Sequence, residues 1–208
     1  MTPILYSFRR CPYAMRARLA LLKSGQDVCL REIKLREKPE AFLQVSVSAT
    51  VPCLVLNDAV IDESIDIMRW ALAQSDPDGW LDMPLEGWEW ISLFDGPFKT
   101  ALDRTKYPTR YPGDDPKRHR ARAVEILAYL DDQMGEWVFE KPSVVDFALL
   151  PFVRQFAGID QDWFDEQPWP RVQAWLARFV SSEAFAAIMH KYEVWQPGDD
   201  AVVFPHAA

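Results

Sequence analysis

The first 75 residues alternate between the hydrophobic spacing of strands and that of helices. Residues 3–8, "PILYSF", form a short apolar run, and residues 27–35, "DVCLREIKL", alternate apolar with polar positions as a half-buried strand does. Two more short strands are predicted at "VPCLVLN" and "AVID", which flank the turn signal Asn57-Asp58. Helices are predicted at 11–25, 38–46 and 63–75. The expected order is strand, helix, strand, helix, strand, strand, helix.

This order predicts a small α/β domain over residues 1–75. Its first strand–helix–strand unit implies a parallel pair with a right-handed crossover, and its last two strands form a hairpin. Residues 76–84, "DPDGWLDMP", have the Pro, Gly and Asp content of a linker. Further helices are expected at 85–105, 116–135, 143–157, 168–180 and 182–191. We therefore expect an all-helical domain over 85–208, whose tail lacks a clear period and is either an ordered flap or a loose end.

Charge and hydropathy exclude some classes of function. The net charge of -8 makes a generic nucleic-acid binder a poor fit, so no nucleic-acid partner is expected. Basic residues concentrate between Lys99 and Arg122, as either a solvated helix face or a dock for an acidic partner or anionic substrate. No apolar run reaches the ~18 residues of a spanning helix, and the start lacks a signal-peptide pattern. We expect a cytoplasmic chain without a membrane partner.

Cys11 is the main candidate for chemistry. The three cysteines and three histidines show no paired or metal-ligand spacing, so neither a disulfide framework nor a metal is expected. Cys11 precedes Pro12 at the start of a predicted helix, where free N–H groups and the helix dipole favour the nucleophilic thiolate. Cys29 and Cys53 lie in strand patterns and are predicted core residues. Positive potential near Cys11 is expected from Arg9, Arg10, Arg16 and Arg18. We interpret Cys11 as a reactive, partly exposed thiol rather than a buried structural one.

Four short motifs occur in a fixed order along the first domain. "CPYAMRAR" starts at Cys11, "KPEAF" at Lys38, "TVPCL" at Thr50 and "DES" at Asp62. Together they resemble the Cys-Pro-aromatic-Ala-x-Arg-x-Arg turn, the Lys-Pro-Glu, the Val-Pro and the Glu-Ser of cytosolic glutathione transferases, most closely the omega class and the two-domain glutaredoxins. Ser143 and Asp146 resemble the capping box of the family's second domain. The resemblance spans about residues 3–190 and implies a thioredoxin-like N-terminal domain followed by an all-α C-terminal domain.

The resemblance also implies a glutathione site. Pro52 is expected to be cis, which turns the Val51 backbone toward the cysteinyl part of glutathione, as an added strand would pair. The Glu63 carboxylate suits the γ-glutamyl ammonium, and the Ser64 hydroxyl with its helix N–H groups suits the γ-glutamyl carboxylate. Lys38 suits the glycyl carboxylate. Glu63 and Ser64 could equally serve as helix caps alone, and the other motifs favour binding.

A cysteine at the position where most conjugating relatives carry Tyr or Ser implies thiol–disulfide exchange. Cys11 would form a mixed disulfide that a second glutathione resolves, and Ala14 excludes a two-cysteine disulfide. The expected function is a glutathione-dependent thiol transferase or reductase. Two alternatives stay open: a glutathione-conjugating transferase, or a non-enzymatic protein resembling the stringent-starvation proteins that bind RNA polymerase. The set of Lys38, Val51, Glu63 and Ser64 favours an enzyme.

An acceptor pocket for a small electrophile or glutathionylated substrate is expected between the domains. Tyr13 is a predicted wall, and the other candidates are Trp88, Trp90, Phe94, Phe98, Tyr107 and Tyr111. Each could instead pack in the core or an interface. The resemblance implies a homodimer, although related two-domain glutaredoxins can be monomeric.

Overall fold

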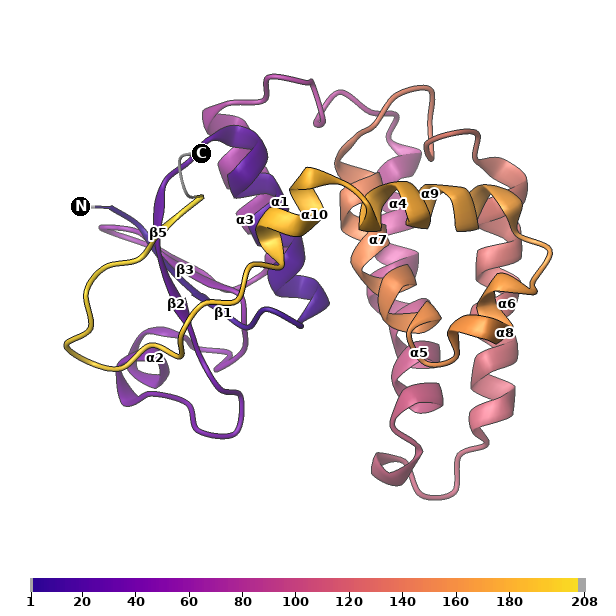
Figure 1. Ribbon diagram of the computed structural model, residues 1–208, viewed down its shortest axis with the longest axis horizontal. Helices are drawn as coiled ribbons and strands as arrows, with labels where there is room; N and C mark the ends of the chain where they lie inside the picture. Colours follow the sequence, from indigo (N-terminus) through magenta and orange to yellow (C-terminus); the bar gives the residue numbers. More distant parts are fainter. Residues whose placement is uncertain (1, 206–208) are drawn as a thin grey trace. The chain divides into compact units, whose positions relative to one another are not determined.

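The computed structural model describes residues 2–205 and divides into two compact units (Figure 1). One unit comprises the residues up to Leu81 together with those from Ser182 onward, and the other is Asp82–Ser181. The first break falls within the expected linker at 76–84. The second break differs from the expected division, because the segment after Ser181 belongs to the α/β unit and not to the helical unit.

Within the described residues, the α/β unit contains a five-stranded sheet in the order β4-β3-β1-β2-β5. The strands are β1 (Ile4–Ser7), β2 (Val28–Glu32), β3 (Cys53–Val55), β4 (Val60–Ile61) and β5 (Val203–Phe204). β1 and β2 are parallel, with Ile4 opposite Cys29, whereas β3 pairs antiparallel with both β1 and β4. The predicted parallel pair and the predicted hairpin are therefore confirmed.

Alternate residues of β1 face different helices. The helices of this unit are α1 (Pro12–Ser24), α2 (Glu40–Val45), α3 (Ser64–Gln74) and α10 (Glu183–Ile188). Ser7 Oγ accepts a hydrogen bond of 2.9 Å from Arg18 Nε on α1, which in turn packs against α3. Tyr6 points the other way, and its ring centroid lies 5.1 Å from that of Phe42 on α2. Both faces of the sheet are therefore covered, and the first residues after β1 emerge at the edge where α1 begins.

The C-terminal segment is an ordered part of the α/β unit. β5 pairs antiparallel with β2, and Leu30 N donates to Val202 O at 2.8 Å. Earlier in the segment, Trp195 N donates to Glu32 O at 2.8 Å, and its ring meets Tyr6 edge-on at 6.0 Å. Of the two expectations for the tail, its described part is therefore the ordered flap, seen as the yellow trace beside β2 in Figure 1.

In the helical unit, a π-helical turn lies within one predicted helix, and one short helix was not predicted. Its elements are α4 (Glu86–Leu93), η1 (Phe94–Phe98), α5 (Lys99–Lys106), η2 (Pro108–Arg110), α6 (Pro116–Gln133), α7 (Val144–Ala157), α8 (Gln161–Asp165) and α9 (Pro170–Val180). The predicted helix over 85–105 is confirmed, but it is not α-helical throughout, because η1 is a π-helical turn between α4 and α5. Pro97 lies inside η1 and has no N–H to donate, which favours a local departure from α-helical bonding. The prediction also missed α8.

A buried carboxylate fixes the start of α7. Asp146 is fully buried, and its two oxygens accept from the backbone N–H groups of Val138 and Ser143, both at 2.9 Å. Ser143 Oγ and Trp175 Nε1 also donate to it, at 3.2 and 3.1 Å. The predicted capping box is therefore confirmed, and it also reaches α9 through Trp175. Burial raises the pKa of Asp146, and these four hydrogen bonds oppose that rise.

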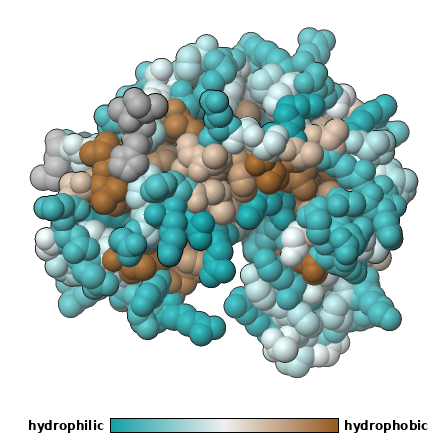
Figure 2. All heavy atoms as spheres, viewed as in Figure 1, coloured by the Kyte–Doolittle hydropathy of each residue, from teal (hydrophilic) through white to brown (hydrophobic). Residues whose placement is uncertain are grey.

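Several of the basic residues between Lys99 and Arg122 form ion pairs with acidic side chains. Arg104 pairs with Asp114 at 2.6 Å, and Arg122 pairs with Glu125 at 2.7 Å. Lys99 pairs with Asp103. These pairs favour the solvated face over the dock, and the surface in Figure 2 is largely hydrophilic. Among the described residues, no helix combines the length and apolar character needed to cross a membrane.

Candidate active site

Cys11 is the N-cap residue of α1. β1 ends at Ser7, and the following turn closes with a hydrogen bond of 2.9 Å from Cys11 N to Phe8 O. Pro12 occupies the first turn of α1, where a missing N–H costs no helical bond. The Cys11 thiol is half-buried and makes no capping bond to its own helix. A cysteine therefore stands partly exposed at the N-terminus of a 13-residue helix, as the sequence predicted.

The segment before β3 lies directly against this thiol. Cys11 Sγ donates to the carbonyl oxygen of Val51 at 3.6 Å. Val51 is buried, and its peptide bond to Pro52 is cis, as the resemblance implied. Because a carbonyl oxygen carries two lone pairs, Val51 can accept a second hydrogen bond from a bound ligand. The structure thus brings together three of the predicted site residues.

Asp62 holds the loop that leads to Val51. Its carboxylate accepts from Ser46 Oγ at 2.9 Å and from Ser48 N at 3.1 Å, and Ala49 between them and Val51 has a φ of +52°. Burial raises the pKa of Asp62, but the hydrogen bonds prevail and hold it below its ordinary value. Sequence reasoning missed this role, although Asp62 opens the quoted "DES" motif.

Glu63 and Ser64 open α3, and a buried arginine joins them to α1. Glu63 is the N-cap residue, exposed and without a side-chain capping bond. Ser64 is buried, and its Oγ accepts from Arg16 Nη1 at 3.4 Å. Arg16 is fully buried and lies five residues after Cys11 on α1. A guanidinium at the start of α3 adds a full positive charge to the N–H groups that suit a carboxylate.

The arginines near Cys11 have distinct environments, and one of them, Arg18, is paired with a carboxylate. Arg18 is fully buried, pairs with Glu32 and donates to Ile188 O at 3.0 Å. Burial lowers the pKa of the Arg18 guanidinium, and the Glu32 carboxylate opposes this. Glu32 also accepts from Arg9 N at 2.6 Å, so this pair holds the turn before Cys11. Because the charge of Arg18 is paired with that of Glu32, it adds little electrostatic potential at Cys11. Arg18 instead supports the site by helping to hold the turn before Cys11 in place.

Cys53, Cys29 and Lys38 differ from one another in burial. Cys53 is fully buried, and burial, with Asp62 nearby, raises the pKa of its thiol to about 12. Cys53 is therefore a neutral core residue, as predicted, whereas Cys29 is half-buried on β2. Lys38 is half-buried just before α2. Its expected role toward the glycyl carboxylate of glutathione is a proposal.

Comparison with known protein families shows which family this chain belongs to. The model described as "Glutathione S-transferase, N-terminal domain" matches residues 5–79, and "Glutathione S-transferase, C-terminal domain" matches residues 100–178. The chain belongs to the cytosolic glutathione transferase superfamily. Its sequence is 24% identical to glutathione S-transferase U28 of Arabidopsis thaliana, over 91% of this chain and 89% of that one.

Solved structures of glutathione transferases share the fold. The Tau class enzyme of mango, Mangifera indica, has a TM-score of 0.76 at 23% identity and covers 91% of this chain and 93% of its own. Glutathione transferase Omega 3C of Trametes versicolor has a TM-score of 0.75 at 18% identity, with coverage of 88% and 82%. The predicted fold, a thioredoxin-like domain with an all-α domain, is confirmed. The predicted likeness to the omega class in particular is not confirmed, because the relatives found by sequence are mainly of the Tau type.

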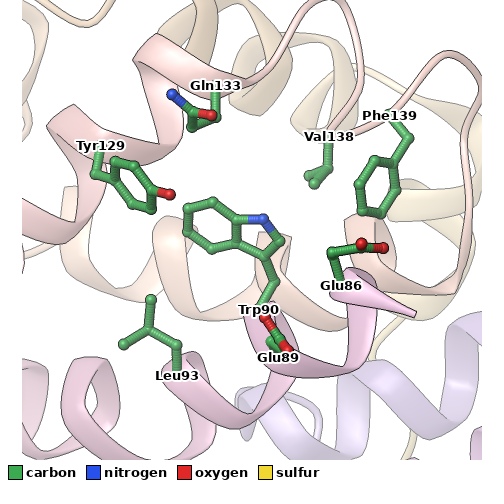
Figure 3. A pocket seen from close by; sticks show the side chains of 8 residues that line it. All are labelled: Glu86, Glu89, Trp90, Leu93, Tyr129, Gln133, Val138 and Phe139. Atoms are coloured by element: carbon green, nitrogen blue, oxygen red, sulfur yellow. The ribbon is translucent and has the colours of Figure 1, made fainter. Parts of the chain in front are cut away.

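The aromatic residues expected in the acceptor pocket of this transferase have different environments. Tyr13 belongs to the α/β unit and is half-buried, with the Arg16 guanidinium carbon 5.5 Å from its ring centroid. In the helical unit, Phe94 is fully buried and stacks on Phe98 at 4.3 Å, so it is a core residue and not a pocket wall. Tyr107 ends α5 with the guanidinium carbon of Arg110 4.2 Å from its ring centroid. Trp90 lines a pocket within the helical unit (Figure 3).

Proposed function

We propose that this member of the superfamily is a glutathione-dependent thiol transferase with Cys11 as its nucleophile. The observation that carries the proposal is the position of the thiol. Cys11 Sγ is half-buried at the N-terminus of α1 and lies 3.6 Å from the carbonyl oxygen that precedes Pro52. Free N–H groups at a helix N-terminus stabilise a thiolate, which is the attacking form. Cys53 is excluded as a substitute by its burial.

The reaction follows from this arrangement in two exchanges. The Cys11 thiolate attacks the glutathionyl sulfur of a mixed disulfide, a bond forms between the two sulfurs, and the other thiol leaves and takes up a proton. The thiolate of a second glutathione then attacks the same glutathionyl sulfur. Oxidised glutathione is released, and the Cys11 thiolate is restored. In sum, one mixed disulfide and one reduced glutathione give one free thiol and one oxidised glutathione, so the electrons balance without a second cysteine.

The glutathione itself is proposed to lie along the start of α3. Its γ-glutamyl carboxylate is assigned to Ser64 and the N–H groups of α3, where Arg16 adds a positive charge, and its ammonium to Glu63. The cysteinyl backbone pairs with Val51 in the manner of an added strand. Lys38 is assigned to the glycyl carboxylate. A cytoplasmic homodimer is part of this proposal, and the family resemblance supports it.

The test is intact-mass spectrometry after incubation with oxidised glutathione. The wild type is expected to gain one glutathionyl adduct, and Cys11→Ser is expected to gain none, because Cys29 lies within β2 without the helix N-terminus that favours a thiolate, and Cys53 is fully buried. Cys29→Ser serves as the matched control and should keep the adduct. An adduct that persists in Cys11→Ser, or that is lost in Cys29→Ser, contradicts the assignment.

Glu63→Ala is expected to weaken glutathione binding by about tenfold to a hundredfold, since a hydrogen bond to a charged group is lost. Isothermal titration calorimetry with reduced glutathione measures the change. Asp66→Ala is the control, because Asp66 is also an exposed acid in the first turn of α3. If the two variants bind glutathione equally well, the γ-glutamyl end is wrongly placed.

Conjugation of glutathione to an electrophile is the second candidate function. The Cys11 thiol acts as a hydrogen-bond donor toward Val51 O, and a donor at that position could also stabilise the thiolate of bound glutathione. In that mechanism Cys11 forms no disulfide. A wild-type protein that binds glutathione but gains no adduct would favour conjugation, and one that binds no glutathione would favour a non-enzymatic binding role.

A further inference from the structure

The turn between β1 and α1 contains one backbone donor that the turn itself does not use. Its four residues run from Phe8 to Cys11, and Cys11 N donates to Phe8 O at 2.9 Å. Arg9 and Arg10 both have negative φ, as the central residues of a type I turn do. The N–H of Arg9 takes no part in this hydrogen bond. It needs an acceptor from another segment, because a backbone donor away from water is rarely left unpaired.

Glu32, at the end of β2, supplies this acceptor. Only 8% of its side chain is exposed, and its Oε1 accepts from Arg9 N at 2.6 Å. Its Oε2 pairs with Arg18, which lies on α1. Hydrogen bonds to an ionised acceptor are roughly twice as strong as neutral ones. One buried carboxylate therefore joins the turn before Cys11 to the helix after it.

The C-terminal segment contacts the same turn and the same strand end. Arg9 Nη1 donates to Met189 O at 3.2 Å. Trp195 N donates to the backbone carbonyl oxygen of Glu32 at 2.8 Å, which fixes the end of β2. The segment, the strand end and the turn all belong to the α/β unit. Glu32 is thus held by its backbone while its side chain holds the turn.

The charge of Glu32 alone would oppose a reactive Cys11. A carboxylate near a thiol favours the protonated form and raises the pKa of the thiol. The Arg18 guanidinium offsets that charge, so the main effect left to Glu32 is geometric. Geometry matters here because the N–H groups and dipole of a helix stabilise a thiolate only within about the first turn.

We propose that Glu32 is a positioning residue for the Cys11 thiol, and that its bond to Arg9 N holds the sulfur at the start of α1, where the thiolate is most stable. This role rests on the proposed function, in which Cys11 is the nucleophile. Without the bond the turn gains freedom, and the sulfur spends less time near the helix N–H groups. The thiol then becomes less acidic and reacts more slowly at neutral pH.

Two substitutions of Arg9 isolate the backbone bond. Arg9→Pro removes the N–H that donates to Glu32, and Pro is favoured at the first central position of a type I turn. Arg9→Ala removes the same side chain and charge but keeps the N–H. The rate of alkylation of Cys11 by iodoacetamide is measured as a function of pH, by mass spectrometry of the peptide that contains Cys11. We expect Arg9→Pro to react at least about threefold more slowly than Arg9→Ala at neutral pH, and with a higher thiol pKa.

Glu32→Ala is the second test, because the two effects of this substitution on the thiol have opposite signs. Loss of a negative charge lowers the pKa of Cys11, whereas loss of the acceptor for Arg9 N raises it. We expect a rise. Glu37→Ala is the control, since it removes an exposed acid of the same unit and should leave the alkylation of Cys11 unchanged.

The proposal is wrong if Arg9→Pro and Arg9→Ala react alike, or if Glu32→Ala folds and its thiol pKa is unchanged or lower. It is also wrong if the wild-type thiol titrates at about 8.5, as an ordinary cysteine does. If Glu32→Ala does not fold, the two Arg9 variants decide. Alkylation requires neither glutathione nor transferase activity, so loss of thiol transfer as a function and loss of this role of Glu32 are separate results.

Discussion

Cys11→Ser is expected to lower kcat/KM for reduction of a cysteine–glutathione mixed disulfide by at least about a thousandfold, because a serine hydroxyl is scarcely ionised at neutral pH and forms no disulfide. The measurement is the rate of oxidised glutathione formation at fixed reduced glutathione. The affinity for reduced glutathione should change little in comparison, since the Glu63 and Ser64 end of the proposed site is not altered.

Substitution of the other two cysteines tests whether the loss of activity is specific to Cys11. Cys53→Ala removes a buried thiol and should keep most of the activity per folded molecule, although it loses stability through a small cavity. Cys29→Ser should be nearly as active as the wild type. If Cys11→Ser retains more than a tenth of the wild-type rate, the nucleophile is not Cys11, and conjugation becomes the better reading of the site.

Most of the α/β unit was predictable, because several of its strands and helices show their buried positions in their hydrophobic spacing. β2 is an example, since Val28 and Leu30 are buried and Cys29 and Arg31 between them are half-buried. The same alternation also buries Glu32, which no local rule anticipates. Its partner Arg18 lies on another element, 14 residues away, and only the fold brings them together.

The missed elements have physical reasons. β5 has two residues, Val203 and Phe204, which are too few to show a period, and its stability comes from pairing with β2. Trp90 and Phe94 were both expected in a pocket because they are aromatic residues of one predicted helix. Phe94 is fully buried and stacks on Phe98, which its residue type does not reveal.

Part of the candidate site could be predicted because its residues lie in short motifs. Cys11, Val51 and Pro52 were identified from such motifs, and the fold brings them within contact distance. The roles of Arg16 and Asp62 were not predicted, because each acts by a hydrogen bond to another segment, at Ser64 and at the loop of Ser48. Residues that position a site depend on tertiary contacts, whereas those that react are recognisable by their chemical type.

Asp146→Ala is expected to lower the free energy of unfolding of the helical unit by about 3–5 kcal/mol, because it leaves buried donors without acceptors. The donors are Val138 N, Ser143 N and Trp175 Nε1, all in buried residues. Urea unfolding followed by tryptophan fluorescence measures the loss.

Two milder substitutions test whether loss of the Asp146 carboxylate as an acceptor causes the loss of stability. Asp132→Ala removes an exposed carboxylate, whose side chain accepts only from Gln133 in the described part of the chain, and should change stability by less than about 0.5 kcal/mol. Ser143→Ala removes one cap hydroxyl and should cost about 1 kcal/mol. If Asp146→Ala costs no more than Ser143→Ala, water must replace the lost acceptor, and the carboxylate does not hold the loop. A cost several times larger would mean that one buried side chain stabilises both the start of α7 and the loop that precedes it.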